Sequence, residues 1–522
     1  MHRWRQYATA ALVACALLLL GPAALSAAQQ TARGVVFHDQ NRNGIRDAGE
    51  PGIRGVRVSN QRDVVATDSE GRYALPVTDD SIVFVIKPSG WTPPLTTERV
   101  KRFYTIHKPA GSPPLRYAGV APTGPLPASI DFPLTPQREP RRFRVLVFGD
   151  TQPRNQEEVD FIAHDVVADL IGSDAAFGMS LGDVVFDDLT VFENLKRTKA
   201  LIGIPWVYVH GNHDTNMDAP EDRLSDETWE RYFGPNYYAF DWGRVHFVVL
   251  DNIHWIARTE TTRARYVSRL GAEQLAFVRN SLAHVPKDRL VVLLMHIPIM
   301  GTEDREELFR LLEDRPRTVS FSAHWHTQEH RFLGSDDGWR GRTPHHHFIA
   351  ATVSGSWWSG APDERGIPHA TMSDGAPNGH SVVTFDGDRY SIVFRAASRP
   401  ASYQMNIHTP SEVAAAESAT TEVLANVFAG SPRCQVEMRI GGGTWLPMER
   451  VLRPDPAFVE MKRLEAGPRP PPGRALPVPQ RSSHLWMARL PAGIEPGTHV
   501  VTVRTTDQFG ARHEGKRVFR VR

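Results

Sequence analysis

Short apolar runs rich in β-branched residues recur through the middle of this chain, and segments with a helical period separate them. The runs predict strands at 144–148, 177–181, 206–209, 245–250, 290–294 and 319–322. Helical spacing appears between them near 159–170, 192–201, 274–283 and 306–312. Later runs at 346–353 and 381–394 have no helix between them. This order favours an α/β domain over residues 141–398, in which stacked mixed sheets are flanked by helices.

The segments on either side of this domain have a different pattern. Residues 33–90 hold short β-branched or aromatic runs around the turn at 68–71, which predicts a small β module. Residues 91–140 are rich in proline and lack periodicity, so they read as a linker or as a loop packed along the next domain. Beyond 400, helix signals fade and strand-like runs alternate with Gly/Pro turns, which predicts a C-terminal β-sandwich over 400–522.

The first 28 residues resemble a secretory signal peptide. Arg3 and Arg5 precede an uncharged apolar run at 10–20, and small residues follow at 26–28. The alternative is an uncleaved anchor helix, but the run is short for a bilayer and breaks at Gly21. We therefore expect a periplasmic, secreted or cell-surface protein with no transmembrane anchor after cleavage. Cys434 is then the one cysteine of the mature chain and forms no internal disulfide.

The overall charge of the chain argues against one class of binding partner. Lys and Arg number 60 against 59 Asp and Glu, so no global basic field exists and a protein that coats nucleic acid is not expected.

Residues 39–50 fit the spacing of a twelve-residue calcium loop. The expected ligands are Asp39, Asn41, Asn43, the carbonyl of Ile45, Asp47 and Glu50. Gly44 stands at the sharp turn of the loop. The alternative is a turn rich in Asn and Gly that binds no ion. The segment 37–58 resembles the calcium-binding B-repeat modules of bacterial surface proteins, which implies a structural Ca²⁺ that stiffens a small domain.

Five short motifs carry metal-ligand side chains, and four of them directly follow or close an apolar run. They begin at Gly149, Gly182, Gly211, Met295 and Ala323. Strands that end in short acid, amide and imidazole motifs are typical of two-metal sites in α/β sandwiches. In order and spacing, the five motifs resemble the calcineurin-like metallophosphoesterase family over roughly 144–394. The resemblance implies a central αββα sandwich, here flanked by an N-terminal small β-sandwich and a C-terminal β-sandwich.

The family resemblance also implies a role for each residue. Asp150, Gln152 and His326 hold a first divalent metal, Asp183 bridges, and Asn212, His296 and His324 hold a second. His213 does not ligate but donates a proton to the leaving oxygen or hydrogen-bonds the phosphate. Asp214, or another acid such as Asp187, orients His213. The attacking group is a metal-bridging hydroxide.

Two positions depart from patterns seen in the family. Gln152 stands where His is common, which weakens the first position and leaves Mn²⁺, Mg²⁺, Zn²⁺ and Fe open. Purple acid phosphatases place a metal-binding Tyr three residues after the bridging Asp, and this chain has Phe186 there. A tyrosinate–iron site is therefore not expected.

The leading hypothesis is an exported dinuclear-metal phosphoesterase that hydrolyses phosphate mono- or diesters of small molecules or of the cell envelope. A narrower version is a pyrophosphatase that acts on nucleotide-linked lipids or sugars. The alternative from another class is a non-catalytic cell-surface binding or adhesion protein with a degenerate phosphoesterase core. The calcium loop and terminal sandwich favour the adhesion protein, whereas the complete ligand set favours the enzyme. Paired Trp357 and Trp358 either contact a substrate or pack between domains.

Overall fold

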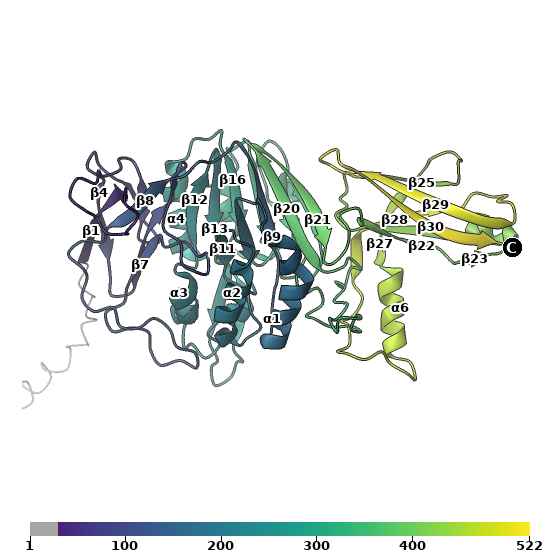
Figure 1. The fold of residues 1–522 in the computed structure, drawn as a ribbon, viewed down its shortest axis with the longest axis horizontal. Helices are drawn as coiled ribbons and strands as arrows, with labels where there is room; N and C mark the ends of the chain where they lie inside the picture. Colours follow the sequence, from purple (N-terminus) through teal and green to yellow (C-terminus); the bar gives the residue numbers. More distant parts are fainter. Residues whose placement is uncertain (1–29) are drawn as a thin grey trace, which may run out of the picture.

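The computed structural model describes residues 30–522, and three units follow one another along its long axis (Figure 1). The signal peptide predicted at 1–28 lies outside the described residues. Within residues 30–522, no helix is both long and apolar enough to span a bilayer.

The N-terminal module is a sandwich of two four-stranded sheets with strand orders β4-β1-β8-β6 and β3-β2-β5-β7. The bounds of these strands are β1 Gln30–His38, β2 Arg57–Ser59, β3 Val64–Ala66, β4 Arg72–Val77, β5 Ser81–Ile86, β6 Trp91–Thr92, β7 Tyr104–His107 and β8 Phe132–Pro136. Val36, Val85 and Leu134 are among the residues buried between the two sheets.

The stretch 91–140 is more than the linker or packed loop predicted from its composition. It supplies β6, β7 and β8, and β8 pairs in parallel with β1, with Phe132 opposite Val36. Local periodicity could not reveal this pairing because the partner strand lies nearly 100 residues earlier in the chain.

Two facing sheets form the central unit. The first has the order β11-β10-β9-β20-β21 and the second β12-β13-β16-β17-β19-β18. The bounds are β9 Arg142–Phe148, β10 Phe177–Leu181, β11 Trp206–Val209, β12 Tyr238–Trp242, β13 Val245–Val249, β16 Leu290–Leu294, β17 Thr318–Ser322, β18 Glu329–Leu333, β19 His345–Ile349, β20 Gly379–Asp386 and β21 Arg389–Ala396. Val145, Phe177, Phe247 and Phe385 are buried in one core that both sheets share.

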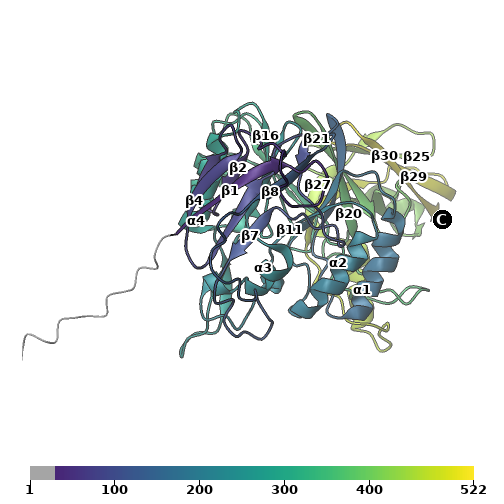
Figure 2. The same ribbon diagram turned by 60° about the vertical axis from the view of Figure 1, so that its left-hand side comes forward.

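Helices cover the outer faces of this pair of sheets and complete the predicted αββα sandwich. The bounds are α1 Gln156–Ile162, α2 Phe192–Ala200, α3 Glu227–Phe233, α4 Gly271–Ala283 and α5 Arg305–Arg310. Helices α1 and α2 lie side by side, and Val159 and Leu195 pack against Phe148 of the first sheet (Figures 1 and 2). Phe277 of α4 and Phe309 of α5 join the core of the second sheet. The sequence pattern did not predict α3 or the hairpin of β14 Ile253–Ile256 and β15 Arg265–Ser268.

The C-terminal unit is the predicted β-sandwich, with strand orders β22-β24-β28-β27 and β23-β30-β29-β25-β26. The bounds are β22 Met405–His408, β23 Glu412–Val413, β24 Glu422–Val427, β25 Gln435–Ile440, β26 Leu446–Pro447, β27 Glu449–Pro454, β28 Arg481–Arg489, β29 Gly497–Thr506 and β30 Arg512–Val521. It also contains one α-helix, α6 Pro456–Glu465, although helix signals fade in this part of the sequence. Asp455 caps α6 by accepting hydrogen bonds from the backbone N–H groups of Ala457 and Phe458.

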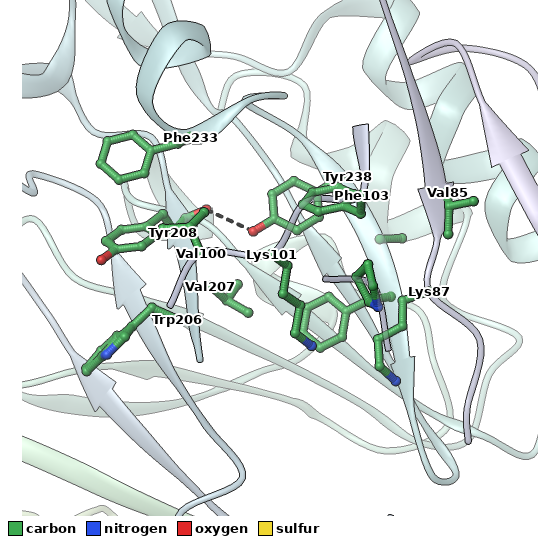
Figure 3. Close-up of a pocket in the computed structure, with 13 residues that line it drawn as sticks. Val85, Lys87, Val100, Lys101, Phe103, Trp206, Val207, Tyr208, Phe233 and Tyr238 are labelled. Atoms are coloured by element: carbon green, nitrogen blue, oxygen red, sulfur yellow. Dashed lines mark hydrogen bonds between the residues drawn. The ribbon is translucent and has the colours of Figure 1, made fainter. Parts of the chain in front are cut away.

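A small cavity lies where the N-terminal module meets the central unit (Figure 3). It is lined by Val85, Lys101 and Phe103 of the N-terminal segment and by Tyr208 and Tyr238 of the central unit. Its volume of about 30 Å³ suits a water molecule rather than a substrate. The cavity does not include the predicted metal ligands.

Candidate metal site

All seven predicted ligands come together at one edge of the paired sheets. Each lies within four residues after the end of its strand. Parallel neighbouring strands bring their carboxyl ends to the same edge, and the ligands therefore lie close together. The strands are β9 for Asp150 and Gln152, β10 for Asp183, β11 for Asn212, β16 for His296, and β17 for His324 and His326.

Asp183, His296 and His324 form the tighter half of the site. One ligand atom from each lies within 4.8 Å of the others, which makes a group able to hold a metal ion. His296 Nε2 is 3.2 Å from Asp183 Oδ1 and 3.1 Å from His324 Nδ1. Asn212 Oδ1 also lies 3.2 Å from His296 Nε2. The other ring nitrogen of His296, Nδ1, is 2.8 Å from the carbonyl of Leu181, which leaves Nε2 for the metal.

The other half of the site contains two buried oxygens that have no hydrogen-bond donor. They are Asp150 Oδ1 and Gln152 Oε1. His326 Nε2 lies 3.5 Å from Asp150 Oδ1, and Gln152 Nε2 donates to Asp183 Oδ2 across 2.7 Å. A buried carboxylate oxygen without a donor is costly unless a cation binds it. The residues present therefore fit a divalent metal that is bound by Asp150, Gln152 and His326.

Backbone strain is concentrated in the same residues. Five of the predicted ligands have positive φ, at 29° for Asp150, 38° for Gln152, 46° for Asp183, 69° for His324 and 52° for His326. Residues other than glycine rarely adopt such angles, and they persist where surrounding contacts hold them. The glycines of the motifs permit close packing, since a Cβ on Gly211 would lie 2.0 Å from the backbone nitrogen of Asp183.

Burial and mutual charge separate the pKa values of these groups. Burial raises the pKa of Asp150 to about 7, and the positive charge of His296 only partly opposes this. Burial would also raise the pKa of Asp183, but its contact with His296 reverses the effect and holds that pKa well below its usual range. Burial lowers the pKa of His324 to about 3 and of His326 to about 4. Both imidazoles are thus neutral near pH 7, the form that binds metal.

His213 lies beside the ligands and makes a strong contact with Asp187. Its Nδ1 is 2.5 Å from Asp187 Oδ1, and its ring stacks on Phe186 with centroids 4.3 Å apart. Burial would lower the pKa of His213, but the hydrogen bond to Asp187 and the negative charges of Asp183, Asp187 and Asp214 together outweigh it, so the pKa is raised. The sequence left Asp187 and Asp214 open as the partner of His213. Buried Asp214 instead accepts hydrogen bonds from the backbone N–H groups of Val184, Val185 and Gly211.

The two tryptophans have different environments. Trp358 is buried, and its indole N–H donates to the carbonyl of Thr151 across 3.3 Å, so it is a packing residue. Trp357 is partly exposed and stacks on His326, with ring centroids 4.0 Å apart and planes at 29°. Tyr266 of β15 lies edge-on to His324 at 6.2 Å. Aromatic side chains therefore flank two of the predicted ligands.

The loop at 39–50 has a closed network of hydrogen bonds. Asp39 accepts from the backbone N–H groups of Asn43 and Gly44, and Glu50 accepts from those of Gln40 and Asp47. Within residues 30–522, the group of acidic and imidazole side chains close enough together to hold a metal ion is the cluster at Asp183. Calcium binding by the loop stays a prediction.

Models of known protein families match most of the chain. The family model for calcineurin-like phosphoesterase matches residues 143–328, and models for its N-terminal and C-terminal parts match 40–116 and 347–513. The C-terminal match begins within β19 of the central sandwich, well before the sandwich at 400–522. No curated protein matches significantly in sequence.

A purple acid phosphatase, PPD1 from yellow lupin (Lupinus luteus) seeds, is among the solved structures that match. It shares 12% identity at a TM-score of 0.34, and the match spans 65% of this chain and 66% of that one. A likeness this distant carries no argument about activity.

Proposed function

Because the chain belongs to the calcineurin-like phosphoesterase family, we propose that it is an exported hydrolase of phosphate mono- or diesters with two divalent-metal positions. The observation that carries the proposal is the donor set at the sheet edge. The cluster of Asp183, His296 and His324 supports one metal position. The unpaired oxygens of Asp150 and Gln152, next to His326, support the other.

Bound divalent ions would neutralise the anionic ester and lower the pKa of the attacking water. Asp183 suits a shared position because its Oδ1 faces His296 and its Oδ2 faces Gln152. One carboxylate between two cations offsets part of their mutual repulsion, whereas the imidazole and amide ligands add no negative charge. With divalent ions bound, the site would keep a net positive charge, which would favour an anionic substrate.

His213 is the proposed proton donor to the leaving oxygen. Its Nδ1 contacts Asp187, so Nε2 is the atom left to face the substrate. Its backbone N–H donates to Asp183 Oδ1 across 2.9 Å, which fixes the imidazole next to the metal ligands without making it one of them. A donor held next to the metal ligands could protonate the leaving alcohol of a bound phosphate ester as the bond breaks.

The test is hydrolysis of p-nitrophenyl phosphate and bis-p-nitrophenyl phosphate by metal-stripped protein supplied with Mn²⁺, Mg²⁺ or Zn²⁺. We expect activity that requires metal and that Asp183→Asn abolishes, and the ratio of the two rates gives the mono- or diester preference. His213→Ala should still bind metal but lose most turnover, and least for good leaving groups. Loss of metal from that variant would show that its role is misassigned. Absence of activity with every metal would favour the non-catalytic binding protein.

A further inference from the structure

One loop of the central unit holds His326 from two sides. The carbonyl of Gly355 lies 2.5 Å from His326 Nδ1, and the indole of Trp357 stacks on the imidazole ring. Because His326 Nδ1 is hydrogen-bonded to the loop, Nε2 is the ring nitrogen left to bind a metal. The stacking fixes the plane of the imidazole ring. A displacement of the loop would therefore move a predicted ligand of the first metal position.

The loop itself has a strained backbone. Trp357 and Trp358 have φ of 57° and 53°, and a Cβ on Gly355 would collide with the carbonyl of Ala370. Two consecutive bulky residues with positive φ require contacts that hold them in place.

Arginine side chains supply those contacts. Arg474 Nη2 donates to the carbonyl of Trp357 across 3.1 Å and to that of Trp358 across 3.2 Å. Arg154 Nη1 donates to the same carbonyl of Trp357 across 3.0 Å. Buried Glu158 of α1 forms ion pairs with both guanidinium groups and fixes their positions.

Arg474 belongs to the C-terminal sandwich unit, in the segment between α6 and β28. Its own carbonyl accepts a hydrogen bond from the backbone N–H of Gly360 across 2.8 Å. Gly473 has a φ of 103°, and a Cβ there would lie 2.3 Å from the carbonyl of Gly360. This segment therefore lies against the loop by backbone contact, and its arginine reaches the part that touches His326.

We propose that Arg474 is a positioning residue through which the C-terminal unit completes the first metal position. It holds Trp357 and Gly355 against His326 and anchors to Glu158 of the central unit. The inference rests on the proposed function only in taking His326 as a metal ligand. The C-terminal sandwich is then part of the metalloenzyme rather than an independent binding module.

The test measures metal binding to the full chain, apart from turnover. Metal-stripped wild type, Arg474→Ala and Arg469→Ala are titrated with Mn²⁺ in competition with a chromophoric chelator. Arg469 is the matched control because it is exposed in the same segment. We expect two binding steps in the wild type and in the control. We assign the weaker step to the first metal position, where Gln152 is the weaker ligand. In Arg474→Ala the metal affinity of this step should fall about 10-fold or more, the usual effect of removing a contact that orients a ligand.

Two further variants separate positioning from general stability. Glu158→Gln leaves the size of the side chain unchanged and should weaken the same step, because both arginines lose their charged partner. Combining Trp357→Ala with Arg474→Ala should weaken binding no further than the larger single effect, since both act on His326. A lower melting temperature with unchanged affinity at both steps would overturn the proposal and leave Arg474 as an interdomain contact. Failure of the wild type to bind metal would instead contradict the proposed function.

Discussion

Asp187 and His213 are joined by a contact of 2.5 Å between Oδ1 and Nδ1, and Phe186 stacks on the face of the imidazole. Asp187 is not among the predicted ligands. Its contact orients the ring and stabilises its protonated form.

Replacement of Asp187 should therefore slow the protonation step and leave metal binding intact. We expect Asp187→Asn to lower kcat by roughly 10- to 100-fold for poor leaving groups such as alkyl phosphates. The loss should be small for p-nitrophenyl esters, whose leaving group needs little protonation. The control is Asp188→Asn, since Asp188 caps the short turn Leu189–Val191 instead. An equal loss for both classes of leaving group would contradict the role of His213 as proton donor.

A second prediction concerns the weaker metal ligand. Gln152→His should raise the affinity of the first position about 10-fold or more for Zn²⁺, because imidazole suits Zn²⁺ better than an amide oxygen does. The same variant removes the donor that Gln152 Nε2 offers to Asp183 Oδ2, so the gain for Mn²⁺ should be smaller. Competition titration with a chelator measures both. Gln156→His, at an exposed position near the site, is the control. Unchanged Zn²⁺ affinity would exclude residue 152 from the metal shell.

The positions of the candidate ligands could be predicted from sequence because most of their signals are local. Four of the five motifs directly follow or close an apolar run, and parallel strands bring those ends together. The acid next to His213 could not be chosen, because Asp214 adjoins it in sequence whereas Asp187, which contacts it in the structure, is 26 residues away. Only the structure shows that Asp214 is occupied by three backbone donors. Arg474 and Glu158 are 316 residues apart, and no periodicity predicts a contact of that kind.

The same reasoning explains what was missed in the fold. Strand β8 pairs with β1, nearly 100 residues earlier, and with the two-residue strand β6, so its composition alone indicated a linker. Helix α3 is seven residues long and buries Glu227 and Glu230 as well as Trp229 and Phe233, so its polar positions do not mark a solvent-exposed face.

A third prediction tests the calcium loop. Addition of excess Ca²⁺ to chelator-treated full-length protein should raise the first melting transition by several degrees, because an ion that binds only the folded loop stabilises it. Glu50→Gln should abolish the shift, since it removes one charge from the expected bidentate ligand. Glu70→Gln, at an exposed turn of the same module, should keep the shift. Differential scanning calorimetry measures it, and no response in the wild type would leave the segment as a turn without an ion.

The last prediction concerns Lys101, which is buried beside the cavity between the N-terminal module and the central unit (Figure 3). Burial, with a smaller contribution from the positive charge of Lys87, lowers the pKa of Lys101 to about 7 from its ordinary value of 10.5. Between pH 7 and 10.5 the unfolded chain holds a proton on this lysine that the folded chain lacks. Its contribution therefore makes the free energy of unfolding rise with pH across that window, by at most about 1.4 kcal/mol per pH unit.

Lys101→Met removes this contribution, so the variant should be more stable than the wild type at pH 7. Its advantage should shrink as the pH approaches 10.5, because the wild type no longer has to release a proton to fold. Urea unfolding at pH 7, 8, 9 and 10 gives the difference directly. Lys516→Met, at an exposed site in β30, should show no such trend. A difference between Lys101→Met and wild type that stays constant with pH would mean that Lys101 is charged in the folded protein throughout, with its charge compensated inside the interface.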